Sequence, residues 1–112
     1  MIKAELVLDQ GLLRSCVIRG HAGAGPKGAD IVCAAVSVLA RTALKTLSDR
    51  LEAVNAEFPE RGEFFLEIPG AIESDKEFIS GVGTFLTEGL LSVSREYPDF
   101  CKVSIEELQN GS

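Results

Sequence analysis

Residues 2–19, IKAELVLDQGLLRSCVIR, predict a β-hairpin, and the rest of the fold can be built outward from it. Every second residue from Ile2 to Leu8 is apolar and most of those between are polar, which is the period-2 pattern of a half-buried strand. Gln10-Gly11 then supplies a turn before a β-rich run over residues 12–19. The chain therefore begins with two paired antiparallel strands.

Two amphipathic helices and further strands follow the hairpin. Asp30 is a good N-cap for a helix from about residue 31 to about residue 51, and Ser74 and Asp75 resemble the start of a second helix that ends before Pro98. Strands are predicted at 54–58, 63–68 and, most clearly, 101–106. The expected order is β-β-α-(β)-β-α-β. A single domain over residues 1–112 buries these faces most simply, as an α+β fold with two helices packed on one face of a mixed, mostly antiparallel sheet.

Composition and charge narrow the class of protein. The 112 residues are 46% hydrophobic and 25% charged, which is ordinary for a folded chain. A formal net charge of −6 without any run of Lys or Arg argues against a protein that coats nucleic acid or an anionic membrane. Lys3, Glu5 and Asp9 interrupt the apolar residues near the N-terminus, so we expect no signal peptide, no transmembrane helix and a cytoplasmic location.

The chain contains three cysteines, Cys16, Cys33 and Cys101, without C-x-x-C spacing. This pattern predicts neither a disulfide framework nor a zinc site, and we expect no metal or other cofactor. Cys16 and Cys101 fall within strand patterns and are assigned to the core. Cys33 would be the third residue of the first predicted helix, where unpaired N–H groups and the helix dipole favour a thiolate.

The only histidine, His21, could form a nucleophilic pair with Cys33. It follows a predicted strand twelve residues before the cysteine, and the intervening loop is long enough to return it to the start of the helix. We expect this loop to be mobile and to close over a substrate, because it is rich in glycine: Gly20, Gly23, Gly25 and Gly28.

Ordinary structural roles remain open for the same residues. A cysteine in the sequence Val-Cys-Ala-Ala is often a packed core residue, and a histidine at the end of a strand is often a surface residue. Ser37 follows Cys33 by four residues and shares its side of the helix. Its hydroxyl would either support the site or bond back to the carbonyl of Cys33, and we favour the second.

The same loop contains a competing motif, because residues 23–28, GAGPKG, match G-x-G-x-x-G. In a dinucleotide-binding fold the glycines form the turn into the helix, whereas Pro26 and the capping Asp30 delay the helix here. The preceding strand belongs to an antiparallel hairpin, and Asp49 falls in a helix instead of at a strand end. Dinucleotide binding is therefore disfavoured, as is nucleotide hydrolysis, because no Walker lysine-serine pair follows.

Gly20-His21-Ala22 and the segment GADIVCAAVS, residues 28–37, resemble the bacterial ribosomal-processing cysteine proteases. The length and the order of elements agree over the remainder of the chain. The loop departs from the family at Ala24, Pro26 and Lys27, where polar or aromatic residues are common. The resemblance implies a cysteine endopeptidase that removes a short N-terminal extension from the precursor of a large-subunit ribosomal protein.

The resemblance also implies roles for individual residues. His21 would be the base, Cys33 the nucleophile, Asp30 a helix-capping or orienting residue, and Ser37 a supporting hydroxyl. Family members are homodimers, and the apolar excess on the first helix is compatible with that state. The acidic chain suits a basic ribosomal protein as partner. The alternative is a ribosome-associated, dimeric binding module that keeps the fold without enzymatic activity.

Overall fold

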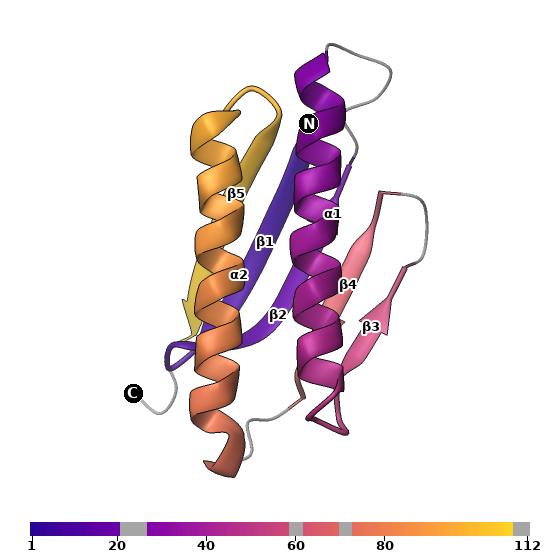
Figure 1. Ribbon diagram of the computed structural model, residues 1–112. Coiled ribbons are helices and arrows are strands. Elements are labelled where there is room, and N and C mark those ends of the chain that lie inside the picture. The colour runs from indigo at the N-terminus through magenta and orange to yellow at the C-terminus, as the bar shows by residue number, and fades with distance from the viewer. Residues whose placement is uncertain (21–26, 59–61, 70–72, 109–112) are drawn as a thin grey trace.

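The computed structural model describes residues 1–20, 27–58, 62–69 and 73–108, and it shows a five-stranded sheet with two long helices on one face (Figure 1). The predicted α+β class and the predicted order of elements are confirmed. The strands are β1 (Ile2–Asp9), β2 (Leu12–Arg19), β3 (Asn55–Glu57), β4 (Phe64–Glu67) and β5 (Cys101–Leu108). The helices are α1 (Lys27–Ser48) and α2 (Lys76–Glu96), and a short 3-10 turn, Glu73–Asp75, precedes α2.

The strands lie in the order β3-β4-β2-β1-β5. The neighbours β3 and β4, β4 and β2, and β2 and β1 are antiparallel, whereas β1 and β5 are parallel. The sheet is therefore mixed and mostly antiparallel, as predicted. The hairpin turns at Gln10 and Gly11, which both have positive φ (53° and 81°), the backbone that a tight two-residue connection between twisted strands requires.

The core lies between the helices and one face of the sheet. The alternation that predicted β1 is observed directly, because its even-numbered residues Ile2, Ala4 and Leu6 are buried while Lys3 and Glu5 are exposed. Each helix contributes one buried stripe at helical spacing. The stripe residues are Val32, Val36, Ala40, Ala43 and Leu47 in α1, and Ile79, Gly83, Leu86 and Leu90 in α2.

The start of α1 differs from the prediction. The helix begins at Lys27, so Asp30 lies inside its first turn and is not the N-cap, and Cys33 is the seventh helical residue instead of the third. Gly28 belongs to the helix and not to the loop. Pro26 directly precedes Lys27, and a proline at a helix start loses no hydrogen bond, because the first N–H groups have no partner within the helix. Proline was therefore a better marker of this boundary than aspartate.

The second predicted helix start is confirmed in position. Asp75 is the N-cap of α2, but its carboxylate makes no capping hydrogen bond. It instead accepts a hydrogen bond from Arg50 Nε at 3.1 Å, and this ion pair joins the segment after α1 to the start of α2. The guanidinium of Arg50 also lies 4.9 Å from the centre of the Phe78 ring.

Part of α1, Ile31–Ser48, is long and apolar enough to span a membrane, with a mean hydropathy of 1.5 over 18 residues. The expectation that the chain has no transmembrane helix rested on the residues near the N-terminus and stays a prediction. Length and composition alone are weak evidence of a membrane span, since core helices of folded domains meet the same requirement. In this fold Val32, Val36 and Leu47 of that stretch are buried in the core.

Candidate active site

Cys33 lies on the flank of α1 that faces away from α2. Leu39 marks the opposite flank, because a Cβ on Gly89 of α2 would lie only 2.8 Å from a Leu39 methyl carbon. Val36 is buried midway between them, three residues from each, so Leu39 and Cys33 are separated by about 120° around the helix. Cys33 is half-buried and packs against the edge of the core. Its thiol is therefore at the border between the core and the surface.

The sheet beneath this flank ends in aromatic residues. Helix α1 begins at the end of the sheet where β2 ends and β4 begins (Figure 1). There Ile18 of β2 pairs with Phe64 of β4, and both are buried. The Phe58 ring meets Phe64 edge-on, with centroids 5.4 Å apart, and remains 56% exposed. The sequence did not predict this aromatic pair. Phe58 follows β3 and Phe64 begins β4, and no local sequence pattern indicates that these two side chains are in contact.

Gly20, directly before His21, has a backbone conformation and a close backbone neighbour that only glycine accommodates. It has a φ of +93°, and a Cβ at this position would overlap the carbonyl oxygen of Met1. No other residue fits here without a shift of the backbone. His21 itself, like Gly23 and Gly25, lies outside the described residues, so the predicted pairing of His21 with Cys33 stays a prediction.

Ser37 is exposed one helical turn after Cys33. Its hydroxyl makes no hydrogen bond to any residue within the described ranges, so the favoured back-bond to the Cys33 carbonyl is not formed. The same helix shows what that bond looks like, since Thr46 Oγ1 donates to the Thr42 carbonyl at 2.7 Å. Asp30 lies in the first turn of α1, one turn before Cys33.

The other two cysteines are core residues, as predicted. Cys16 and Cys101 are both fully buried. Desolvation by burial raises the pKa of Cys16 to about 12, and it also raises the pKa of Cys101. Both thiols therefore remain neutral at physiological pH. Among the described residues, no three His, Cys, Asp or Glu side chains gather in a way that could hold a metal ion.

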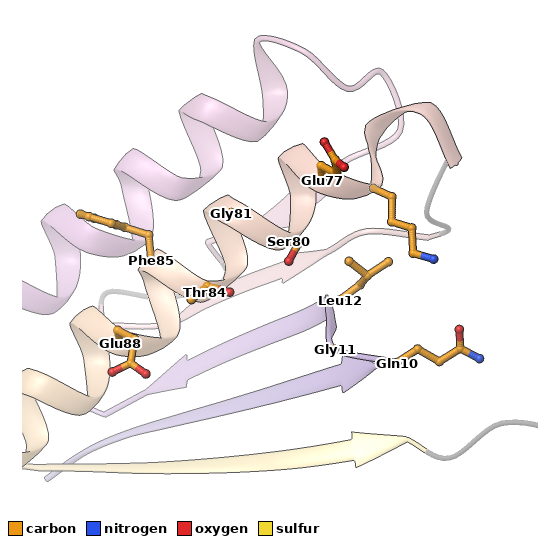
Figure 2. Close-up of a pocket in the computed structure, with 10 residues that line it drawn as sticks. Gln10, Gly11, Leu12, Glu77, Ser80, Gly81, Thr84, Phe85 and Glu88 are labelled. Atoms are coloured by element: carbon orange, nitrogen blue, oxygen red, sulfur yellow. The ribbon is translucent and has the colours of Figure 1, made fainter.

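A surface hollow of about 870 Å³ lies elsewhere, between the β1–β2 turn and the first four turns of α2 (Figure 2). Leu12 forms its floor, and Glu77, Ser80, Thr84 and Glu88 line the helical side. The hollow lies beside the β1–β2 turn, and Figure 1 shows this turn at the end of the molecule opposite the start of α1. Its lining includes neither cysteine nor histidine.

Comparison with known proteins identifies related chains. A family model described as cysteine protease Prp matches residues 1–102. A search of curated proteins finds no match. Among solved structures, SMU.848 from Streptococcus mutans is 26% identical, with a TM-score of 0.82 over 96% of each chain.

Two structures of the essential ribosomal processing protease Prp from S. aureus share the fold as well. The one in complex with a substrate peptide is 17% identical, with a TM-score of 0.79. The one in complex with a covalently linked product peptide is 18% identical, with a TM-score of 0.77. In both cases the match covers 95% of this chain and 100% of the other.

Proposed function

Because the chain belongs to the Prp family of cysteine proteases, we propose that it removes a short N-terminal extension from the precursor of a large-subunit ribosomal protein. The family match over residues 1–102 includes both His21 and Cys33. The S. aureus protein of the same fold is a ribosomal processing protease that has been captured with a substrate peptide and with a covalently linked product peptide. A peptide of the precursor is therefore the substrate class that best suits this chain.

The observation that carries the proposal is the difference in burial among the three cysteines. Cys16 and Cys101 are fully enclosed, whereas Cys33 is half-buried at the surface of α1. A nucleophile must reach the carbonyl carbon of its substrate, and Cys33 is the cysteine that can do so without unfolding. Its flank also offers the exposed Ser37 as a neighbour for a bound peptide.

In the proposed reaction, Cys33 and His21 act as a pair. His21 accepts the thiol proton, and the sulfur of Cys33 attacks the scissile carbonyl carbon. As the tetrahedral intermediate collapses, the C–N bond breaks and His21 returns the proton to the departing amine, leaving a thioester on Cys33. Water then attacks the thioester with His21 as base, which releases the new carboxylate and restores the thiol.

The neighbouring residues support this chemistry in the proposal. Asp30 orients the site from the first turn of α1, and the hydroxyl of Ser37 hydrogen-bonds to His21 or to the substrate. Closure of the segment that begins at Gly20 would bring His21 to Cys33 when substrate binds. The reaction needs no metal or other cofactor, since the thiol and the imidazole supply nucleophile and base.

The proposal also covers the partner of the enzyme, its location in the cell and its oligomeric state. A formal charge of −6 attracts a basic ribosomal protein in a salt-dependent way. We place the enzyme in the cytoplasm, where such precursors are made, without a direct role for nucleic acid or membrane. We also propose that it works as a homodimer.

The test is cleavage of a synthetic peptide that spans the N-terminus of the precursor, followed by mass spectrometry. Reduced wild-type protein should yield two products, and Cys33→Ala should yield none. Cys16→Ala is the matched control, because it removes a buried thiol and should keep the activity. A folded wild-type protein that binds the peptide and leaves it intact would contradict the proposal and favour a binding module.

A further inference from the structure

Strand β5 forms one edge of the sheet, and it is unusually open. It has eight residues, whereas β3 at the opposite edge has three. Every residue from Ser104 to Leu108 is exposed, including Ile105 at 43% and Leu108 at 37%. A long edge strand presents a row of backbone N–H and C=O groups that can pair with another strand. The short β3 edge offers much less.

The charges on β5 are not balanced within the chain. Lys102 stands directly beside Lys3 of β1 in the sheet register, and like charges in such positions repel. Glu106 stands beside the apolar Val7. Neither Lys102 nor Glu106 forms an ion pair with another residue in the described part of the chain. Neither group therefore has a counter-charge directly beside it on β1.

We propose that β5 pairs antiparallel with β5 of a second copy of this chain, about a two-fold axis at Ser104, to form a ten-stranded sheet. Directly opposite residues in a sheet point to the same face, so a two-fold pairing must join residues of the same parity. Only the register centred on Ser104 then places Lys102 opposite a carboxylate, that of Glu106 of the partner subunit. The symmetry supplies this pair twice.

The same register also matches apolar residues on the helix-covered face. It sets Val103 opposite Ile105 of the partner subunit. Val103 and Ile105 stand beside the buried Ala4 and Leu6 of β1, so the apolar layer would continue across the axis. Helix α2 already lies over this edge, since Ser94 Oγ donates to the Cys101 carbonyl at 2.9 Å. Pairing would therefore cover Ile105 and would also supply hydrogen-bond partners for the free backbone N–H and C=O groups of β5.

This inference names the surface for the homodimer of the proposed function, and its test does not depend on peptide cleavage. Sedimentation velocity over a micromolar dilution series should give twice the chain mass of 12.0 kDa for the wild type. Lys102→Glu and Glu106→Lys should each weaken dimerisation by about tenfold or more, because each replaces two attractions by two repulsions. The double variant Lys102→Glu/Glu106→Lys restores both attractions and should restore the dimer.

Controls separate this surface from others. Glu52→Lys changes the charge as Glu106→Lys does, at an exposed position after α1, and should leave the dimer intact. Lys102→Glu places a carboxylate beside Lys3, so the monomer should remain folded by circular dichroism. A monomeric wild type, or a double variant that stays dissociated, would overturn the proposal. So would a dimer that resists both single reversals but dissociates in Val38→Glu, which would place the contact on the exposed face of α1.

Discussion

Gly83 of α2 lies so close to Leu13 of β2 that a Cβ on the glycine would be 2.9 Å from the Leu13 Cβ. This contact sets how closely α2 approaches the hairpin. Gly81, two residues earlier on the same helix, has nothing within 4 Å of the corresponding position. The packing of the helix against β2 therefore requires a glycine at position 83 but not at position 81.

Replacement of these glycines by alanine should change stability in opposite directions. Gly83→Ala should lower the free energy of unfolding by about 1–2 kcal/mol, because the cost of overpacking exceeds the gain in helix propensity. Gly81→Ala should raise it by about 0.5–1 kcal/mol, because only the propensity changes. Urea denaturation of both variants measures the difference. A stabilised Gly83→Ala variant would show that α2 can move away from Leu13 at little cost.

Gly20 and Gly11 provide a second matched pair. Both have positive φ, but only Gly20 has a backbone neighbour, the Met1 carbonyl, where its Cβ would be. Gly11→Ala should cost about 1–2 kcal/mol of stability from the left-handed backbone alone. Gly20→Ala should cost more and should also reduce peptide cleavage, because the shift displaces His21. Equal losses of stability with equal activity would contradict this role of Gly20.

The hairpin, both helices and the pattern of β5 were predictable because each depends on local periodicity. The parallel pairing of β1 with β5 was not, since alternation alone does not say which strands become neighbours. The start of α1 was misplaced because Asp30 is a stronger capping signal than Pro26, although proline marked the boundary. Cys33 was assigned as the nucleophile from its motif, and this stays a prediction. It lies in the second turn of α1, so the assignment rests on the accessibility of its thiol and not on the free N–H groups of the first turn.

Thiol labelling tests that accessibility directly. Brief treatment of the native protein with iodoacetamide should modify Cys33 first, because Cys16 and Cys101 are buried and their raised pKa values keep them neutral. Peptide mapping by mass spectrometry identifies the modified residue. In urea all three cysteines should react, which provides the positive control. Modification of Cys16 or Cys101 before Cys33 would show that the nucleophile is misassigned.

Alkaline pH should destabilise the protein through Cys16. Burial raises the pKa of this thiol from 9.0 to about 12 in the folded state, so between these values the unfolded chain releases the proton while the folded chain retains it. Stability is therefore lost as the pH rises through this window, by up to about 4 kcal/mol from this group. Cys16→Ala should start less stable at neutral pH but should lose less between pH 9 and 11. Urea denaturation at each pH would reveal parallel losses in both proteins if Cys16 had no part.

Substitution of His21 separates the base from the nucleophile. Cys33→Ala should abolish turnover because no covalent route remains, whereas His21→Ala should reduce kcat/KM by about 10²–10⁴ at neutral pH. Part of the lost rate should return at higher pH, where a thiol ionises without a base. His21→Gln is the matched variant, since it keeps a polar side chain that cannot accept the proton. Rates for both His21 variants across a pH series, with circular dichroism to confirm folding, decide the matter: wild-type cleavage by a folded His21→Ala protein would leave Cys33 with another base.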